Sequence, residues 1–342
     1  MEKILNVGVV GCGYWGPNLI RNFSKNLQCR VKKACDINED RLTHIKKYYP
    51  SIITTSEFEN LEGDSELDAI VLAIPVRLHH EMAKRSLLAG KHTFIEKPMA
   101  TSSEKCTELI ALAAKKNLTL MVGQTFLYSV PVCRIKEIVE SGEIGEIQYI
   151  SARRLNLGLF QQDINVAWDL ASHDISIILY LMGRLPTSVN CQGKANMTKN
   201  IEDVTNMSLN FDNGGFAMIH SSWLDPNKVR EMIIVGSKKM IVYDDNEPLE
   251  KIKIFDKRVE RPPHYDTFAE FHFSYHYGDA YIPHLKQVEP LKLETQHFLD
   301  CILNGKKSRT SGEEGLRVVQ ILEAASISMK NGGTKVGIKY DL

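Results

Sequence analysis

The feature that most constrains the fold lies within the first nineteen residues. An apolar run of strand type, Ile4–Val10, leads directly into three glycines at the spacing G-x-G-x-x-G, and an apolar helical pattern follows. This order predicts a strand, a tight turn and a helix. Gly11 permits the sharp turn, Gly13 leaves room for a pyrophosphate beside the backbone, and Gly16 lets the helix pack close to the strand. We therefore expect a dinucleotide site, with the N–H groups at the helix start facing the phosphates.

An acidic residue in the right place strengthens this prediction. Asp36 ends a second apolar run, Val31–Cys35, about 20 residues beyond the last of the three glycines. A carboxylate there accepts hydrogen bonds from the adenosine ribose and disfavours a 2′-phosphate, so the predicted cofactor is NAD. The alternative is that Asp36 is a turn or helix-capping residue in the polar run Asp36–Asp40.

Composition limits the class of protein. The chain has 342 residues, more than most single cores accommodate, so two domains are expected. Net charge is zero, which argues against a nucleic-acid-binding surface, and no apolar run reaches membrane-spanning length. The seven cysteines are scattered without a C-x-x-C pair, as is typical of reduced thiols. Because a strand begins within a few residues of the N-terminus, leaving no room for a signal peptide, we expect a cytoplasmic protein without metal, nucleic-acid or membrane partners.

The first part of the chain alternates between strand and helix patterns, which predicts a parallel sheet with helices on both faces. We therefore predict an α/β fold that begins with a doubly wound Rossmann domain over residues 1–122. The predicted strands are Ile4–Val10, Arg30–Cys35, Ala69–Leu72, His92–Ile95 and Leu118–Val122, and the predicted helices are Pro17–Leu27, Glu39–Tyr48, Leu78–Ala89 and Ser103–Lys116.

The pattern changes after Gly123. The run Asp212–Gly215 is a hairpin signal between two alternating strands, and Gly236-Ser237 separates two more. Neighbouring strands without intervening helices indicate an antiparallel sheet. We therefore predict that residues 123–342 form an α+β domain with a large, open, mainly antiparallel sheet, and that this domain binds substrate and mediates oligomerisation. Its predicted helices are Val130–Glu140, Val166–Met182, Leu293–Leu303 and Glu313–Lys330.

Two stretches of the first domain are candidates for chemistry. Ala73–His79 follows the strand Ala69–Leu72, at the sheet edge where doubly wound folds bind their ligands. Glu96-Lys97-Pro98 closes the strand His92–Ile95, and Pro98 keeps Lys97 extended. Partial burial would lower the pKa of Lys97 and make it a usable acid or base. Each stretch could also be an ordinary turn.

The third candidate lies in the second domain. On a helix, Asp169 and His173 are four residues apart and share a face, so the acid could set the tautomer and charge of the imidazole. A metal site is less well supported, because no further ligands stand at suitable spacing. A structural polar face of the helix is the alternative.

Together these motifs resemble the glucose–fructose oxidoreductase/inositol dehydrogenase/rhizopine catabolism (Gfo/Idh/MocA) family. The resemblance rests on the glycine loop, on Glu96-Lys97-Pro98 and on the Asp169-x-x-x-His173 motif, in this order along the whole chain. It implies hydride transfer between NAD(P) and a sugar or polyol carbon, with Lys97 and His173 as active-site residues from the two domains. One departure is Ser176, which stands where many members carry an acid. This departure disfavours polyol dehydrogenases as the nearest relatives.

Three stretches resemble the nucleotide-sugar 3-dehydrogenases of this family: Gly13–Leu19, Asn156–Gln161 and Val166–Ala171. The resemblance implies NAD-dependent oxidation of the C3 hydroxyl of a UDP-N-acetylglucosamine-like sugar, for later amination in amino-sugar or lipopolysaccharide biosynthesis. Three alternatives stay open: a UDP-N-acetylglucosaminuronate 3-dehydrogenase, an NADPH-dependent 3-ketoreductase, and a regulator that binds NAD and sugar without catalysis.

The predicted site has three groups of residues. The catalytic residues are Lys97, His173 and Asp169. The cofactor residues are Gly11, Gly13, Tyr14, Trp15, Gly16, Asp36, Ile37, Arg41, Ala73, Pro75, His79, Glu96, Lys97 and Gln124. The substrate residues are Lys97, Arg154, Asn156, Asn165, Trp168, Asp169 and His173, with Arg154 suited to a diphosphate or, equally, to a solvated strand end.

An aromatic stretch near the C-terminal third points to assembly. Aromatic residues alternate with polar ones between Phe271 and Tyr277, which is the period of a strand. His272 and His276 would share a face but lie too far apart for an easy metal site. We expect this surface to pack in a homodimer or homotetramer.

Overall fold

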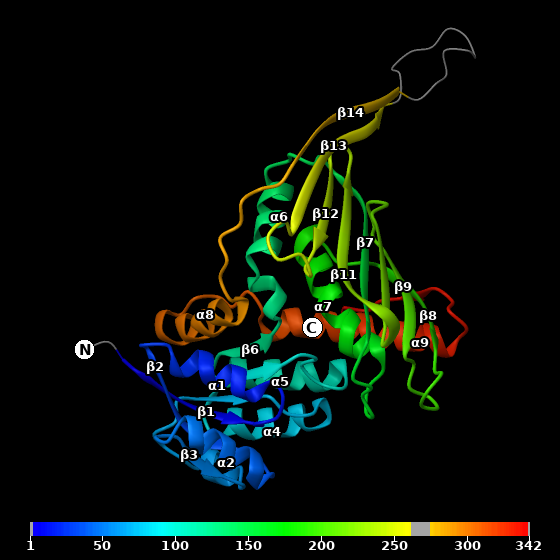
Figure 1. The fold of residues 1–342 in the computed structure, drawn as a ribbon. Coiled ribbons are helices and arrows are strands. Elements are labelled where there is room, and N and C mark those ends of the chain that lie inside the picture. The colour runs from blue at the N-terminus through cyan, green and yellow to red at the C-terminus, as the bar shows by residue number, and fades with distance from the viewer. Residues whose placement is uncertain (1–2, 261–273, 341–342) are drawn as a thin grey trace, which may run out of the picture. The chain divides into compact units, whose positions relative to one another are not determined.

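The computed structural model describes residues 3–260 and 274–340, and the chain divides into two compact units. The first unit comprises residues 1–129, 288–323 and 340–342, and the second comprises residues 130–287 and 324–339. The boundary predicted at residues 122 and 123 differs from this division, because the chain returns to the first unit after residue 287. Figure 1 labels many of the elements of both units.

The first unit contains a six-stranded parallel sheet in the order β3-β2-β1-β4-β5-β6. The order reverses between β1 and β4, which is the switch point where doubly wound folds bind ligands. The strands are β1 (Leu5–Val10), β2 (Cys29–Cys35), β3 (Ile53–Thr55), β4 (Ala69–Leu72), β5 (His92–Glu96) and β6 (Leu120–Gly123). The predicted parallel Rossmann sheet is confirmed. Sequence reasoning missed β3, which has only three residues and no buried one.

Helices follow these strands as the alternation predicts. They are α1 (Gly16–Ser24), α2 (Glu39–Tyr48), α3 (Glu59–Glu62), α4 (Val76–Leu88) and α5 (Ser103–Lys116), and a 3₁₀ turn, η1 (Thr125–Tyr128), follows β6. Ser102 caps α5 by accepting the backbone N–H of Lys105, and Asn38 caps α2.

A helix from late in the sequence completes the core of the first unit. The ring of Phe298 in α8 (Pro290–Asn304) packs edge-on against Phe23 of α1 and Phe94 of β5, with centroids 6.2 and 5.6 Å apart. All three side chains are fully buried. Periodicity identifies α8 as an amphipathic helix but not the unit that its apolar face covers, which explains the error in the predicted boundary.

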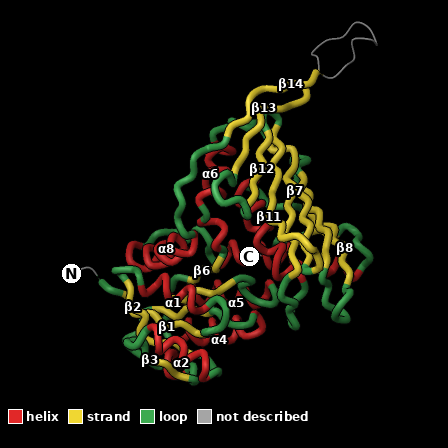
Figure 2. Tube along the Cα trace, in the orientation of Figure 1, coloured by secondary structure: helices red, strands yellow, loops and turns green. Residues whose placement is uncertain are grey.

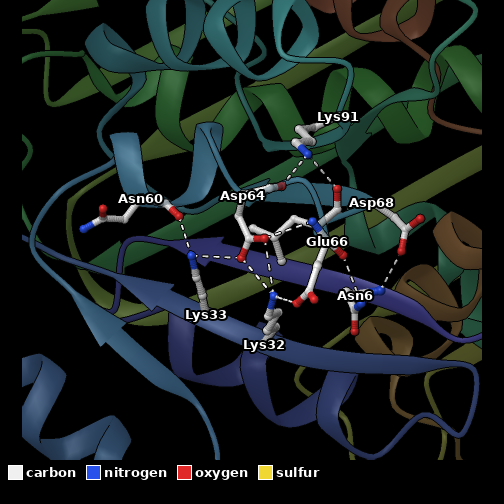
Figure 3. A network of polar contacts seen from close by, with 9 residues as sticks. Asn6, Lys32, Lys33, Asn60, Asp64, Glu66, Asp68 and Lys91 are labelled. Atoms are coloured by element: carbon white, nitrogen blue, oxygen red, sulfur yellow. Dashed lines mark hydrogen bonds and ion pairs between the residues drawn. The ribbon is translucent and has the colours of Figure 1, made fainter.

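In the first unit, a polar network connects strands β1 and β2 with the segments that precede β4 and β5 (Figure 3). The carboxylate of Asp64 accepts Lys32 Nζ at 3.0 Å and Lys33 Nζ at 2.9 Å. Buried Lys91 donates to the backbone oxygens of Asp64 and Leu67. Since each buried ammonium has oxygen partners, this network is explained by stability and needs no ligand.

The second unit contains a nine-stranded sheet in the order β14-β13-β12-β11-β7-β10-β9-β8-β15, coloured yellow in Figure 2. All neighbouring pairs are antiparallel except β7 with β10. The strands are β7 (Ile147–Leu157), β8 (Ser188–Lys194), β9 (Val204–Asn210), β10 (Phe216–Ser222), β11 (Leu224–Gly236), β12 (Met240–Asp244), β13 (Ile252–Glu260), β14 (Ser274–Tyr281) and β15 (Val336–Gly337). The predicted mainly antiparallel sheet and the hairpin between β9 and β10 are confirmed.

One face of this sheet is covered and the other is more open. Ile150, Ala152 and Arg154 alternate along β7 and are buried on the face where α7 (Ser172–Met182) packs. Tyr149 and Met218 are more than a third exposed. The second unit also contains α6 (Val130–Glu140), and α9 (Gly312–Lys330) begins in the first unit and ends in the second. Of the predicted aromatic strand, Phe271–Phe273 lie outside the described residues and the rest belongs to β14, where His276 pairs with Asp256.

Candidate active site

The glycine loop folds as its sequence predicts. Gly11 has φ +90°, and a Cβ at this position would collide with the backbone oxygen of Ala73 after β4. A Cβ on Gly16 would collide with the oxygen of Gly11. These two glycines are therefore required by the backbone of the turn itself.

Gly13 differs, because no backbone crowds it. A Cβ there would meet only the guanidinium of Arg41, at 3.5 Å. Helix α1 begins directly beyond, and its N-cap residue, Trp15, makes no side-chain capping bond. The turn thus offers an open approach to backbone N–H groups at a helix start, which fits the pyrophosphate of a dinucleotide.

Asp36 is held at the end of β2 with acceptor capacity to spare. Its Oδ2 accepts the Cys12 backbone N–H at 2.7 Å, and its Oδ1 accepts that of Asn38 at 2.9 Å. A carboxylate has about four lone-pair sites, so ribose hydroxyls could still donate to it. Arg41 lies 3.4 Å from Oδ2, between Asp36 and Gly13, and its side chain is half exposed. The residues present therefore fit an adenosine ribose.

The other predicted cofactor residues differ in how far they are buried. Tyr14, Ile37 and Pro75 are exposed, Ala73 is half-buried, and Gln124 is buried. His79 is also buried, and its ring nitrogens lie 2.8 Å from the backbone oxygens of Pro98 and Ile74. Burial lowers the pKa of this imidazole. The neutral ring has one N–H, so one of these two contacts is a hydrogen bond and the other is a close approach, and His79 thereby links two loops of the fold. Its contact with the cofactor stays a prediction.

Glu96 connects the glycine loop to the lysine motif. Its Oε1 accepts the indole N–H of Trp15 at 2.6 Å, and Lys97 follows it, half-buried at the end of β5. A Cβ on Gly123 would lie 2.9 Å from the Glu96 carboxylate, so a side chain on β6 there would push this carboxylate aside. Burial raises the pKa of Glu96 to about 7, and the Trp15 bond and the charge of Lys97 oppose this rise.

A second buried carboxyl, Glu294 of α8, lies within the electrostatic range of Glu96. It is fully buried, and its Oε2 accepts the hydroxyl of Thr125 at 2.6 Å. Its Oε1 has no hydrogen-bond partner among the described residues. Burial, followed by the charge of Glu96, raises the pKa of Glu294 well above its usual value. Glu294 therefore holds its proton to higher pH than an exposed glutamate, and sequence reasoning did not identify it.

Replacing Glu294 by glutamine should make the chain relatively more stable at alkaline pH. Because the folded pKa is raised, the wild type loses stability as pH rises above about 4.5, when the unfolded state ionises first. Glutamine removes this loss. From pH 5 to pH 8 the difference in unfolding free energy should therefore change in favour of Glu294→Gln.

Urea unfolding at the two pH values measures this change. Asp300→Asn on the same helix is the control, because the hydrogen bond from Lys306 keeps the pKa of Asp300 below its usual value. Its effect on stability should be equal at pH 5 and pH 8, where both states are ionised. An equal effect of Glu294→Gln at both values would show that Glu294 is charged in the folded protein.

In the second unit, the helix predicted to run unbroken from Val166 to Met182 begins with a π turn, η2 (Ala167–Ala171), before α7. Asp169 lies in this turn, and half-buried His173 lies just beyond it. The Oδ2 of Asp169 accepts the indole N–H of Trp223 at 3.1 Å. Single π turns inside helices often occur at functional sites.

The guanidinium of Arg154 is paired with a carboxylate of the protein itself. Its Nε and Nη2 donate to the two carboxylate oxygens of Asp174 at 2.9 and 2.8 Å, and both side chains are almost fully buried. Arg154 faces the helix-covered side of β7 with Ile150 and Ala152, which the period of the strand could have revealed. A contact with a substrate diphosphate is therefore not supported, and Asp174 is the partner that sequence reasoning missed.

Two other predicted substrate residues also have partners within the second unit. Asn165 donates to Glu202 at 2.8 Å and accepts the backbone N–H of Trp168. The Trp168 indole donates to Ser326 at 3.0 Å. Asn156 is half-buried beside Gly158. Of these three residues, Asn156 has the fewest described side-chain hydrogen bonds, so its amide has the most donors and acceptors left for a sugar.

Other kinds of site find less support in the described residues. Within ranges 3–260 and 274–340, no group of three or more His, Cys, Asp or Glu side chains could hold a metal ion. No helix of the same ranges is long and apolar enough to cross a membrane. The arrangement therefore offers a dinucleotide cradle with a strand-end lysine in one unit and an Asp–His motif in the other.

Comparison with known proteins agrees with this chemistry. An uncharacterized oxidoreductase of Bacillus subtilis (strain 168), YrbE, is 26% identical over 97% of this chain and 96% of its own. Inositol 2-dehydrogenase of Rhizobium meliloti (strain 1021) is 22% identical over 93% and 94%. The solved structure of UDP-N-acetylglucosamine 3-dehydrogenase GnnA from Acidithiobacillus ferrooxidans has a TM-score of 0.78 and 21% identity over 97% and 99%, a likeness of fold.

Two family models match most of the chain. Residues 5–124 match the oxidoreductase family with an NAD-binding Rossmann fold, and residues 132–242 match the GFO/IDH/MocA C-terminal domain. The chain therefore belongs to the GFO/IDH/MocA family of oxidoreductases.

Proposed function

We propose that this oxidoreductase uses NAD⁺ to oxidise the C3 hydroxyl of a UDP-N-acetylglucosamine-like nucleotide sugar. The observation that carries the proposal is the Asp169–His173 motif at a π turn, in a family member in which Lys97 directly follows strand β5 of the Rossmann sheet. The fold-level likeness to a UDP-N-acetylglucosamine 3-dehydrogenase supports the choice of substrate. The product would be a 3-keto sugar, suited to later amination.

In the proposed mechanism, two side chains act on one hydroxyl. Bound NAD⁺ supplies the acceptor for the hydride that leaves the sugar carbon. His173 removes the hydroxyl proton, and Asp169 orients its imidazole and stabilises the positive charge that forms. Lys97 donates a hydrogen bond to the developing alkoxide. The functions of Lys97 and His173 could be exchanged, because each side chain carries a nitrogen able to take or give a proton.

The main alternative is a different substrate within the family. The similarity to an inositol 2-dehydrogenase would favour a free polyol. A UDP-N-acetylglucosaminuronate 3-dehydrogenase would use the same chemistry with one further carboxylate on the sugar. A sensor that binds without catalysis would not need the Lys97 and His173 pair. The homodimer or homotetramer and the cytoplasmic location remain predictions.

A screen of substrates tests the proposal. Purified protein with NAD⁺ or NADP⁺ is assayed for reduced nicotinamide with UDP-N-acetylglucosamine, UDP-N-acetylglucosaminuronate, UDP-glucose and myo-inositol. The proposal expects the highest kcat/KM with UDP-N-acetylglucosamine. Activity with myo-inositol alone would contradict it, and activity highest with the uronate would replace it by the alternative.

The cofactor preference is expected to depend on Asp36 and Arg41 together. Wild type should prefer NAD⁺, because the Asp36 carboxylate lies beside the predicted ribose site and repels a 2′-phosphate. Asp36→Ala should shift the ratio of kcat/KM values toward NADP⁺ by about tenfold, since about 1.4 kcal/mol corresponds to this factor. The substitution also releases Arg41 from its neighbour.

The double variant Asp36→Ala/Arg41→Ala is the matched control. It should lose most of the gain with NADP⁺, because the guanidinium available to a 2′-phosphate is gone. Equal kcat/KM values for both cofactors in the wild type would contradict the prediction.

A further inference from the structure

Trp223 donates a side-chain hydrogen bond to the carboxylate of Asp169. It stands between β10 and β11, is 1% exposed, and donates its indole N–H to Asp169 Oδ2 at 3.1 Å. The proposed mechanism so far gives Trp223 no function. A buried donor aimed at a proposed active-site acid therefore requires explanation.

The indole is held in place by its own surroundings. The Trp223 backbone N–H donates to the oxygen of Asp203 at 2.9 Å, and its carbonyl accepts the N–H of Gly158 at 3.0 Å. Its ring packs against Phe160 with centroids 5.5 Å apart. Asp203 is itself buried and accepts three hydrogen bonds, two from Asn196 and one from Met197. These contacts hold the indole N–H in place independently of its bond to Asp169.

The backbone of Asp169 is fixed as well. Its N–H donates to the oxygen of Asn165 at 3.1 Å, and its carbonyl accepts the hydroxyl of Ser172 at 3.0 Å. These backbone bonds set the position of Asp169 in the π turn, and the direction of its carboxylate depends on the contacts of the side chain itself. The indole of Trp223 restricts the rotation of this carboxylate, because a bond to Oδ2 turns it in one direction.

This bond also fixes which way the carboxylate faces. An indole N–H can only donate, so its partner on Asp169 must be an acceptor oxygen, and Oδ2 is the oxygen that it holds. An oriented acid is what an imidazole needs to keep its proton on the side away from the substrate. We propose that Trp223 is a positioning residue for the dehydrogenation, holding the carboxylate of Asp169 turned toward the imidazole of His173. This inference rests on the proposed function.

The direct test is a titration of His173 in the full-length protein by NMR, without substrate or cofactor. Trp223→Phe removes the N–H and keeps an aromatic ring. Trp223→Phe releases the carboxylate from its position beside the imidazole, and Asp169→Asn removes its charge. In both variants the imidazolium is stabilised less, so the pKa of His173 should fall. Phe160→Leu, which disturbs the ring packing but leaves the indole N–H, is the control and should leave this pKa unchanged.

Kinetics with UDP-N-acetylglucosamine and NAD⁺ provide the second readout. Trp223→Phe should lower kcat about tenfold, the rate equivalent of one hydrogen bond, with KM little changed. The acid limb of the kcat–pH profile should shift to lower pH. Because both residues act through the same imidazole, the double variant Trp223→Phe/Asp169→Asn should lose no more than Asp169→Asn alone.

The outcomes separate this inference from the proposed function. An unchanged His173 pKa in Trp223→Phe, or a loss of kcat that multiplies with that of Asp169→Asn, would reduce Trp223 to a packing residue and overturn the inference. If Trp223→Phe does not fold, the NMR resonance of the Trp223 indole N–H is compared between the wild type and Asp169→Asn. It should move upfield in Asp169→Asn, and a resonance that stays in place would overturn the inference. Near-normal kcat in His173→Ala would instead overturn the proposed function.

Discussion

Replacing His173 by alanine is expected to lower kcat by about a hundredfold or more, the scale of a lost general base. The affinity for NAD⁺ should change little, because His173 lies outside the nucleotide-binding unit. Stopped-flow measurement of reduced nicotinamide at saturating substrate determines the rate of the chemical step, and a binding titration determines the affinity. His220→Ala, which removes a half-buried histidine from β10 of the same unit, is the control and should keep its activity.

Lys97→Ala should lower kcat to a similar extent, because it removes the proposed donor to the alkoxide. If Lys97 and His173 act on the same hydroxyl, the double variant should lose far less than the product of the two single losses. Near-normal turnover in His173→Ala would return the Asp169–His173 motif to a structural interpretation. A fully multiplicative double loss would mean that the two residues act in separate steps.

Replacing Arg154 by methionine is expected to destabilise the second unit by about 3–5 kcal/mol, the cost of leaving one buried charge unpaired. The Asp174 carboxylate would lose both guanidinium bonds in an environment from which water is excluded. Urea unfolding should therefore begin at a lower concentration. The double variant Arg154→Met/Asp174→Leu should recover most of the stability, since neither charge then remains buried.

The neighbouring Arg153 provides a matched control. Its side chain is half exposed and lies 3.8 Å from Glu231, so Arg153→Met should change stability by less than about 1 kcal/mol. If Arg154 bound a diphosphate instead, Arg154→Met would keep wild-type stability and raise KM for the nucleotide sugar. That result would restore the sequence-based interpretation of this residue.

The parts of the fold that depend on local pattern were predictable from the sequence. Gly11 and Gly16 mark a turn that tolerates no side chain, and the alternation of strands and helices around them implies a parallel sheet. The hairpin at Asp212–Gly215 is likewise encoded by its turn residues. The return of α8 to the first unit was not predictable, because an amphipathic helix does not specify its partner.

The same distinction applies to the candidate site. Asp36 is recognisable by its distance from the glycine loop, and Asp169 with His173 by their spacing. Glu294 and Trp223 are far from these motifs in sequence: Glu294 bonds Thr125 in the first unit, and Trp223 bonds Asp169 in the second. Arg154 was misread because its charge suggested an anion, whereas the buried partner is Asp174. Such pairings depend on tertiary contacts, which a single sequence does not display.

Transfer of a labelled hydride tests the central claim most directly. UDP-N-acetylglucosamine that carries deuterium at C3 is incubated with the enzyme and NAD⁺, and the reduced cofactor and the sugar are analysed by mass spectrometry. The proposed function predicts a reduced cofactor that is heavier by one deuterium and a keto sugar that has lost the label. Reduced cofactor without deuterium, formed while the sugar retains its label at C3, would contradict oxidation at this carbon.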